Sequence, residues 1–271
     1  MEIIVAGQPA YIYNGGKTPA PGDIAKQPVV VFIHGAQQDH SCWGLQSRWF
    51  AHHGFSAVVP DLPGHGRSGG EPLASVEAVA DWIAALLDAL GVGKAFLVGH
   101  SMGSLVALEA GLRHPGRVSL LALIGSALPM PVADVLLDAA RGNEPKAVAM
   151  VNGWSYSATG QMGGNTVPGL WMLGLNKRLM ERQKKGVFHT DLAACNAYVR
   201  SLDSLGALDL PVLVVAGSAD RMTALKASRA LAGAIKGAQL HVLPGSGHAL
   251  MAERPDGVLD ALIGFAAAGG N

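Results

Sequence analysis

The sequence predicts an α/β fold, with a mostly parallel, doubly wound β-sheet flanked by helices and an inserted helical cap. Apolar β-branched runs such as Pro28–Ile33 indicate strands buried on both faces of a parallel sheet. These runs alternate with helix-like segments at the spacing of βαβ units. The alternation stops in the middle of the chain and later resumes. We therefore expect a core made of residues 1–128 and 207–271, and a cap made of residues 129–206.

The core elements are expected in chain order, beginning with two short edge strands. The clearest helix is Ser75–Leu90, because its apolar residues recur with a helical period, Ser75 is a suitable N-cap and Gly91 follows its end. The predicted strands are Glu2–Ala6, Ala10–Tyr13, Pro28–Ile33, Phe55–Val59, Ala95–Val98, Val118–Ile124, Pro211–Ala216 and Gln239–Leu243. The predicted core helices are Cys42–His53, Ser75–Leu90, Leu105–Ala110, Ala224–Ile235 and Asp256–Ala267.

The predicted cap contains no β-rich run and several helix-like segments. The helices are expected at Val132–Arg141, Pro145–Asn152, Leu170–Lys185 and Leu192–Leu205, with a Gly/Thr-rich joint at Gly160–Val167. We interpret this segment as an inserted helical cap.

Composition excludes several classes of protein. Of the 271 residues, 49% are hydrophobic and the formal net charge is zero, so disorder, nucleic-acid binding and attachment to anionic membranes are disfavoured. No apolar stretch approaches the ~20 residues of a membrane span, and the N-terminal run Ile3–Ala6 is too short for a signal peptide. Cys42 and Cys195 are too few for a disulfide framework or a thiolate metal site. We expect a soluble cytoplasmic protein.

The most informative motif is Gly99-His100-Ser101-Met102-Gly103, between a predicted strand and a predicted helix. This is the G-x-S-x-G pattern of a nucleophile elbow, which holds a serine on a sharp, strained turn. Glycines two residues before and after the serine allow close approach of neighbouring backbone. A strand-to-helix turn with Ser101 as an ordinary N-cap is the structural alternative.

Two further residues follow core strands at the carboxyl edge of the sheet, where sites form in open α/β folds. Asp220 comes shortly after the strand Pro211–Ala216, and His248 lies in the loop after the last strand. A serine hydroxyl needs a base to take its proton, and the base must be oriented. Ser101, Asp220 and His248 have the residue types for these roles, although Asp220 also suits a turn or a helix cap.

These motifs together resemble the α/β-hydrolase fold family, specifically a lidded serine hydrolase of the esterase or lactonase kind. The resemblance covers nearly the whole chain and includes the elbow, His34-Gly35, the Asp61–Ser68 loop, Asp220 and His248 in family order. It implies that Ser101 is the nucleophile, that His248 is the general base and then the acid, and that Asp220 orients His248. It implies neither a metal nor an organic cofactor.

The resemblance also implies an oxyanion hole formed by the backbone N–H groups of Ala36 and Met102. His34 is a candidate pocket residue, and bracing of the loop by hydrogen bonds is the favoured alternative. His100 either lines the pocket or packs beneath the turn. Asp61 is expected to tie down a turn.

Methionine and tryptophan side chains of the predicted cap suggest an apolar, adaptable substrate pocket. The candidates are Met150, Trp154 and Trp171, for which the alternative is that they form the cap's own core. A basic run from Lys177 to Lys185 is either a solvated helix face or a receptor for a substrate carboxylate.

The leading functional hypothesis is cleavage of a carboxylic ester or lactone of a small, largely apolar substrate through an acyl-enzyme. Hydrolysis of a carbon–carbon bond in a diketone-like substrate and cofactor-free perhydrolysis use the same triad. Family members of the first kind often carry Trp after the catalytic His, whereas Ala249 follows His248 here. Haloalkane dehalogenation is disfavoured, because it needs a carboxylate in place of Ser101. The non-enzymatic alternative is a catalytically silent small-molecule receptor.

Overall fold

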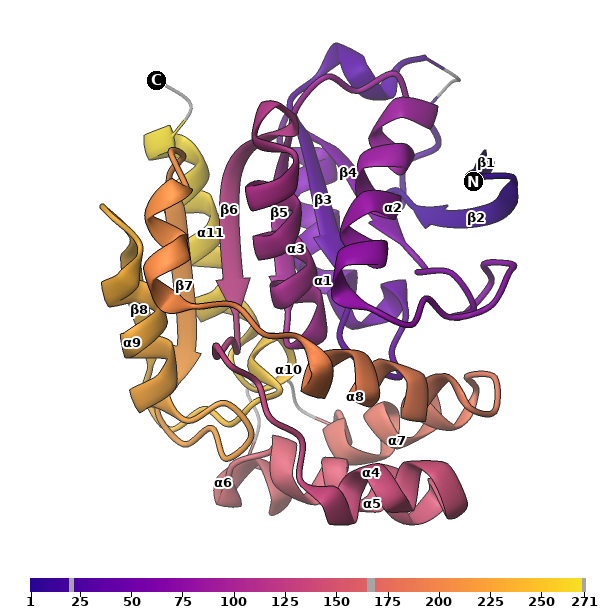
Figure 1. Cartoon of the computed structure of the whole chain (residues 1–271), viewed down its shortest axis with the longest axis vertical. Coiled ribbons are helices and arrows are strands. Elements are labelled where there is room, and N and C mark those ends of the chain that lie inside the picture. Colours follow the sequence, from indigo (N-terminus) through magenta and orange to yellow (C-terminus); the bar gives the residue numbers. More distant parts are fainter. Residues whose placement is uncertain (20–21, 165–168, 270–271) are drawn as a thin grey trace.

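The computed structural model describes residues 1–19, 22–164 and 169–269, and within them an eight-stranded sheet forms the centre of the molecule (Figure 1). The predicted α/β architecture is confirmed. The strands are β1 (Glu2–Val5), β2 (Gln8–Tyr13), β3 (Val29–Ile33), β4 (Ser56–Pro60), β5 (Ala95–His100), β6 (Val118–Ile124), β7 (Val212–Gly217) and β8 (Gln239–Leu243). Their order across the sheet is β1-β2-β4-β3-β5-β6-β7-β8.

The sheet is parallel from β4 to β8, and β1 and β2 add an antiparallel edge. Ile33 at the end of β3 pairs with Gly99 near the end of β5, and Gly217 at the end of β7 pairs with Leu243 at the end of β8. Because parallel strands end at one edge, the loops that follow β3, β5, β7 and β8 all emerge on the same side of the sheet.

Helices cover both faces of the sheet (Figure 1). The core helices are α1 (Gly44–His52), α2 (Val76–Ala89), α3 (Met102–Arg113), α9 (Leu225–Ala234), α10 (Leu250–Glu253) and α11 (Pro255–Gly269). Apolar residues of α2, α3 and α9 form one core cluster, and those of α1 and α11 form the other. Short 3-10 turns lie at Ile24–Lys26, His40–Trp43 and Pro115–Arg117, and at η4 (Leu202–Ala207).

Ser75 is the N-cap of α2 as predicted, since its hydroxyl accepts the N–H of Ala78 at 3.1 Å. The predicted helix Cys42–His53 instead begins as a 3-10 turn. The carboxylate of Asp39 accepts the N–H of Ser41 at the first residues of this turn. The four-residue α10 was not predicted, as it is too short to show a helical period.

Among the described residues, five α-helices, called the cap helices below, lie between β6 and β7 in the sequence and beyond the carboxyl ends of the strands in space (Figure 1). They are α4 (Asp134–Gly142), α5 (Glu144–Ser155), α6 (Ala158–Gln161), α7 (Met172–Glu181) and α8 (Val187–Ala197). Several of them share a separate apolar cluster that includes Leu136, Val148 and Phe188. Part of the expected joint Gly160–Val167 is helical, as α6, and its last three residues lie outside the described ranges.

Two cap helices end earlier than predicted, and the first is α7, which ends at Glu181 instead of Lys185. The expected helix Leu192–Leu205 is broken between α8 and η4. Tyr198 and Arg200 in the break both donate hydrogen bonds to the buried carboxylate of Glu109 on α3. Pairing of this buried charge outweighs continuation of the helix.

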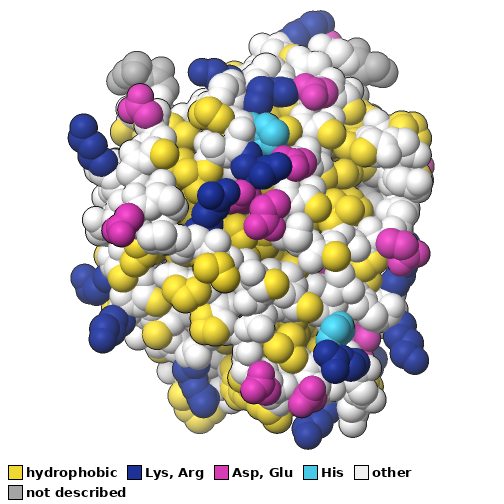
Figure 2. All heavy atoms as spheres, viewed as in Figure 1, with side chains coloured by type: hydrophobic (Ala, Val, Ile, Leu, Met, Phe, Trp, Pro, Cys, Tyr) yellow, Lys and Arg dark blue, Asp and Glu magenta, His cyan; other side chains and the backbone are white. Residues whose placement is uncertain are grey.

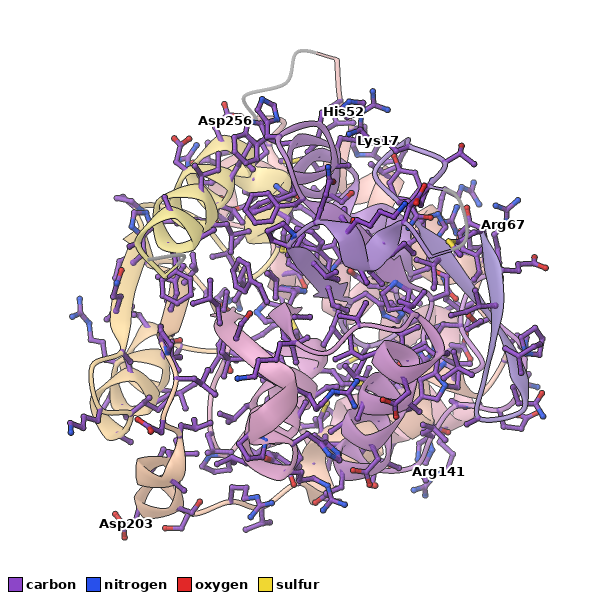
Figure 3. All side chains as sticks on the ribbon, turned by 90° about the horizontal axis from the view of Figure 1, so that it is seen from above. Lys17, His52, Arg67, Arg141, Asp203 and Asp256 are labelled. Carbon is purple, nitrogen blue, oxygen red and sulfur yellow. The ribbon has the colours of Figure 1, made fainter. Side chains whose placement is uncertain are left out.

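The surface is mixed in charge. Figure 2 shows acidic and basic side chains interspersed on the face viewed, and Figure 3 shows charged side chains such as Lys17, Arg67 and Asp256 at the periphery. Among the described residues, no helix combines the length and the apolar character needed to cross a bilayer.

Candidate active site

Ser101 lies on a sharp turn between β5 and α3. Its backbone has φ 53° and ψ −120°, a positive φ that is costly for a residue with a side chain. The turn is held by the Ser101 N–H, which donates to the carbonyl of Ile124 at 3.0 Å, and by the Ser101 carbonyl, which accepts the N–H of Ser104 at 2.8 Å. Backbone hydrogen bonds to two neighbouring elements therefore maintain the strained conformation.

The glycines of the motif occupy positions where a side chain does not fit. A Cβ atom at Gly99 would overlap the carbonyl of Gly103, and a Cβ atom at Gly103 would overlap the carbonyl of Ile33 at the end of β3. The expected close approach of backbone around the serine is confirmed at both positions.

The hydroxyl of Ser101 does not serve as a helix cap, because it makes no capping hydrogen bond at the start of α3. This contradicts the alternative in which Ser101 is an ordinary N-cap. Ser101 instead lines a cavity at the carboxyl edge of the sheet.

His248 and Asp220 are paired. Nδ1 of His248 donates to Oδ2 of Asp220 at 2.9 Å, and both side chains are buried. Because Nδ1 carries the proton, Nε2 is left as the basic nitrogen. Nε2 is buried and has no hydrogen-bond partner among the described residues, so it does not bond to Ser101 in this structure. Such hydrogen bonds are often long or misaligned without substrate.

Asp220 uses its two oxygens for different tasks. Oδ1 accepts the N–H groups of Met222 and Thr223, each at 2.8 Å, which is the turn role considered for this residue. Oδ2 faces His248 and Thr223. Burial acts to raise the pKa of Asp220, but His248 and the hydrogen bonds outweigh it and lower the pKa to about 2. The carboxyl group is therefore ionised near neutral pH.

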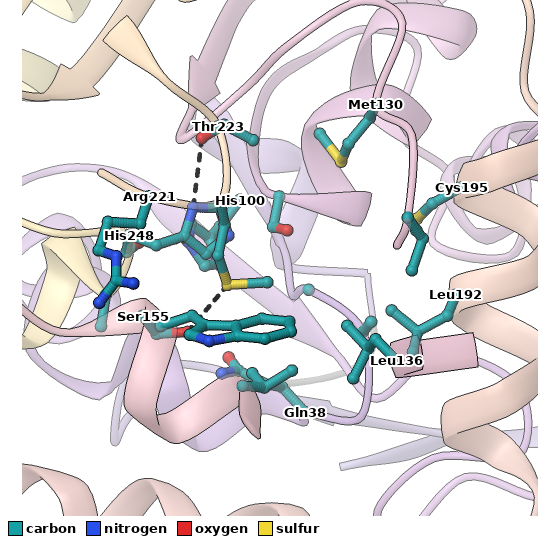
Figure 4. A pocket seen from close by; sticks show the side chains of 18 of the residues that line it. Gln38, His100, Met130, Leu136, Ser155, Leu192, Cys195, Arg221, Thr223 and His248 are labelled. Atoms are coloured by element: carbon teal, nitrogen blue, oxygen red, sulfur yellow. Dashed lines mark hydrogen bonds between the residues drawn. The ribbon is translucent and has the colours of Figure 1, made fainter. Parts of the chain in front are cut away.

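Thr223 was missed by sequence reasoning. Its Oγ1 donates to Oδ2 of Asp220 at 2.7 Å and lies 3.2 Å from Nδ1 of His248 (Figure 4). It therefore fixes the carboxylate against the imidazole ring. Its place three residues after Asp220 was the only signal, and a threonine in a loop is too common to interpret.

Ser101 and His248 both line a cavity of about 210 Å³, which Figure 4 shows from close by. Its walls combine residues from the sheet edge with residues from the cap helices. The apolar lining residues include Met130, Val132, Leu136, Val151, Trp154, Phe188, Leu192 and Cys195. The polar lining residues include Gln38, Ser155, Asn176, Arg221 and Thr223.

The two expected oxyanion donors are the backbone N–H groups of Ala36 and Met102. Met102 is the first residue of α3, so its N–H precedes the helical hydrogen bonds. Ala36 follows β3 and lines the cavity. Within the described ranges, no protein group accepts a hydrogen bond from either N–H. Both donors are thus available to another acceptor.

The two histidines proposed for the pocket differ. His100 lines the cavity and also packs beneath the turn, with its ring centroid 4.8 Å from that of His248 and Nε2 bonded to the His248 carbonyl at 2.9 Å. Burial lowers its pKa to about 3. His34, contrary to its place among the pocket candidates, does not line the cavity. Its Nδ1 donates to the Gly35 carbonyl and its Nε2 accepts the Leu62 N–H, which is the bracing alternative.

Of the three cap candidates, only Trp154 lines the cavity. Met150 packs against the cap's own apolar cluster, so it matches the structural alternative. Trp171 is 74% exposed and lies outside the lining. The spacing of apolar residues could not distinguish the inner face of each cap helix from its outer face.

The basic run Lys177–Lys185 also lies outside the cavity lining. Lys177 and Arg178 pair with Glu181, and Arg182 pairs with Asp39 of the loop after β3. These cations have protein partners, which does not match the alternative of a receptor for a substrate carboxylate.

The loop that follows Ala36 is held by the cap through residues that sequence reasoning did not identify. The Gln37 N–H donates to Oδ2 of Asp191 on α8 at 2.8 Å, and Asp191 also accepts Nε2 of His65 at 2.9 Å. Burial acts to lower the pKa of His65, but Asp191 outweighs it and the pKa is raised. The Gln37 side chain further donates to Glu144 on α5 and to the Met180 carbonyl on α7.

Asp39, His40 and Asp61 form a cluster of potential metal ligands, and protein groups already satisfy it. Asp61 accepts hydrogen bonds from the N–H and Nδ1 of His40 and from the Arg67 N–H, which is the expected tying of a turn. Asp39 is bonded to Ser41 and to Arg182. These hydrogen bonds tie the loop after β3 to the Asp61–Ser68 loop and to Arg182.

The chain is similar to known hydrolases over almost its whole length. It is 28% identical over 264 residues to the 2-hydroxy-6-oxo-6-phenylhexa-2,4-dienoate hydrolase of Burkholderia cepacia. The aligned region covers 91% of this chain and 90% of that protein. Among solved structures, Est816, described as an N-acyl homoserine lactone degrading enzyme, superposes with a TM-score of 0.83 at 26% identity, covering 98% of this chain and all of that one. A thermophilic esterase superposes with a TM-score of 0.82 at 26% identity, and the superposition covers 100% of this chain and 98% of that one.

The family model described as the alpha/beta hydrolase family matches residues 30–261. This range includes the elbow, the paired Asp220 and His248 and the cap helices. The sequence match and the observed fold agree, and the chain belongs to the alpha/beta hydrolase family.

Proposed function

We propose that the protein is a serine hydrolase that cleaves a carboxylic ester or a lactone of a small, largely apolar substrate. The observation that carries this proposal is that Ser101 and His248 line one cavity while Asp220 holds His248 through Nδ1. A hydroxyl nucleophile, a neutral imidazole and an orienting carboxylate are the parts required for acyl transfer.

In the proposed mechanism, Oγ of Ser101 attacks the substrate carbonyl carbon and Nε2 of His248 takes the hydroxyl proton. The negative charge on the carbonyl oxygen is stabilised by the N–H groups of Ala36 and Met102. Collapse of the tetrahedral intermediate breaks the ester C–O bond, and the leaving alkoxide takes the proton from His248. Water then attacks the acyl-enzyme, again with His248 as base, and releases the acid and Ser101.

The cavity supports a small substrate with an apolar part. Its volume of about 210 Å³ and the side chains of Leu136, Trp154 and Phe188 on its walls suit an alkyl or aryl group. Because α4, α5 and α8 contribute these residues, we propose that residues 129–206 form a cap that shapes the substrate pocket.

Hydrolysis of a carbon–carbon bond is the second candidate, favoured by similarity to the Burkholderia cepacia dienoate hydrolase. Ala249 after His248 still distinguishes this chain from the family members that carry Trp there. Perhydrolysis and the silent receptor remain alternatives on the same site.

The test compares three substrate classes on the purified protein. Straight-chain esters and lactones of increasing length are assayed for acid release, and a dienoate ring-cleavage product is assayed for loss of its chromophore. Hydrolysis of esters or lactones that disappears in Ser101→Ala and falls by about 10⁴-fold in Asp220→Asn supports the proposal. Turnover of the dienoate alone contradicts it in favour of carbon–carbon hydrolysis.

A further inference from the structure

Three buried side-chain atoms of cavity-lining residues have no hydrogen-bond partner among the described residues. They are Nε2 of His248, Nδ1 of His100 and Oε1 of Gln38. The proposed mechanism uses Nε2 of His248, and Nδ1 of His100 faces the backbone of Gly35, since a Cβ there would lie 3.3 Å from it. Oε1 of Gln38 has no role in that mechanism. A buried carbonyl oxygen without a partner is uncommon and calls for a ligand or an ordered water.

A chain of amide groups fixes which end of Gln38 is unpaired. Nε2 of Gln38 donates to Oδ1 of Asn176 at 3.1 Å, and Nδ2 of Asn176 donates to Oδ1 of Asn152 at 2.8 Å. The same Nδ2 lies 3.6 Å from the thioether sulfur of Met180. A thioether can only accept a hydrogen bond, so the nitrogen end of Asn176 faces Met180 and its oxygen end faces Gln38. Gln38 must therefore donate to Asn176, which leaves its oxygen unpaired.

The position of Gln38 is fixed from both sides of the loop. The preceding Gln37 is held by Asp191 through its backbone N–H, and the following Asp39 is held by Arg182 and Gln183 of the cap. With Asn176 binding its side chain, Gln38 is anchored before any ligand enters. An acceptor that is already in place costs little ordering entropy on binding.

The surroundings indicate the charge of the group that Gln38 would receive. Among the described residues that line the cavity there is no carboxylate, and Arg221 is a cation on its wall. An ammonium group would be repelled by Arg221 and would lack a counter-charge. A neutral donor, either a hydroxyl or an amide N–H, matches a neutral carbonyl acceptor in a mainly apolar cavity.

We propose that Gln38 is a specificity-determining residue whose side-chain oxygen accepts a hydrogen bond from a hydroxyl or amide N–H of the ester or lactone substrate. The inference rests on the proposed function, because it names the substrate class of the same cavity. A site built to receive a donor disfavours an analogue that lacks it, since the acceptor is then left buried and unpaired.

The test uses two pairs of p-nitrophenyl esters that differ at one group. The N-acetylglycine ester is compared with the 4-oxopentanoate ester, in which CH₂ replaces N–H, and the 3-hydroxybutanoate ester is compared with the 3-methylbutanoate ester. The quantity measured is the ratio of kcat/KM within each pair, which does not depend on the fraction of active protein. The variants are Gln38→Met, which removes the acceptor at similar length, and Gln239→Met, a control on the exposed face of β8.

We expect the wild-type protein to prefer the donor-bearing ester by at least about tenfold in one pair. This ratio should fall to about one in Gln38→Met and persist in Gln239→Met. Ratios near one in the wild-type protein, or a preference that persists in Gln38→Met, would overturn the inference while leaving ester hydrolysis intact.

Binding of the same pairs to Ser101→Ala, measured by calorimetry, tests Gln38 without chemistry. If the wild-type protein hydrolyses no ester, the proposed function fails. The calorimetric binding measurement still tests whether Gln38 accepts a hydrogen bond from the bound ligand. Tighter binding of the donor-bearing ester that is lost in Ser101→Ala/Gln38→Met supports the subsite. Equal binding of both members of each pair overturns it.

Discussion

Oδ2 of Asp220 accepts a hydrogen bond from Nδ1 of His248 at 2.9 Å, and this contact determines which ring nitrogen remains basic. The two residues come from loops that follow neighbouring strands, β7 and β8, whose ends pair in register. Thr223 adds a second donor to the same oxygen.

Replacing Thr223 by Val should lower kcat about tenfold, because Asp220 then loses a donor that orients its carboxylate towards His248. Thr223→Ser keeps the hydroxyl and serves as the matched control, with activity close to wild type. Steady-state kinetics on an ester that the wild-type protein hydrolyses provide the measurement. Equal activity of Thr223→Val and wild type would show that Asp220 alone suffices.

Replacing Asp191 by Ala should lower kcat about a hundredfold and change KM less than threefold. The Gln37 N–H loses its acceptor, and the neighbouring Ala36 N–H, a proposed oxyanion donor, loses its fixed position. The measurement is kcat and KM at a temperature where circular dichroism shows the variant folded. Asp209→Ala, at an exposed residue, is the control. A raised KM with unchanged kcat would instead place Asp191 in substrate binding.

Replacing Gly99 by Ala should reduce the free energy of unfolding by about 3 kcal/mol or more, because the added Cβ overlaps the Gly103 carbonyl. Gly93→Ala is the matched control, since a Cβ there meets no atom within 4 Å. It should change stability by no more than about 0.5 kcal/mol. Urea denaturation measures both, and similar values for the two variants would contradict the described turn.

Stability should fall as the pH is lowered from about 6 to 5. Burial lowers the pKa of His34 to about 4 and that of His100 to about 3, whereas both bind protons below about pH 6.5 once unfolded. The unfolded state thus binds more protons than the folded state in this window. Each of the two residues therefore lowers the free energy of unfolding by about 1.4 kcal/mol for each pH unit of acidification. His65 has a raised pKa, so its contribution is already complete below about pH 6.5 and is lost only at higher pH.

The measurement for this prediction is denaturant unfolding at pH 6 and pH 5. In His34→Gln the loss of stability between the two pH values should be smaller by about 1 kcal/mol than in the wild-type protein. An unchanged difference would mean that His34 remains protonatable in the folded state.

The sequence predicted those parts of the molecule that depend on local pattern. The predicted strand Val118–Ile124 and the predicted N-cap residue of α2 agree with the structure, because β-branched runs and N-capping residues act over a few positions. The elbow was equally visible, because its serine and two glycines stand within five consecutive residues. Asp220 and His248 were found because each follows a strand at the same edge of the sheet.

The rest depends on contacts between residues distant in sequence. Asp191 lies 154 positions from Gln37 and 126 from His65, and no local pattern links a cap helix to the loop after β3. Thr223 was hidden by the commonness of threonine in loops. The exposure of Trp171 and the packing of Met150 depend on how the cap helices face one another, which their apolar spacing left open.

The proposed function requires Ser101 to be an activated nucleophile. The most direct measurement is intact-protein mass spectrometry after exposure to a fluorophosphonate, with Ser101→Ala treated in parallel. We predict a single covalent adduct on the wild-type protein and none on the variant. Well-folded wild-type protein without an adduct, or an adduct of equal yield on Ser101→Ala, would contradict it and favour the silent receptor or another nucleophile.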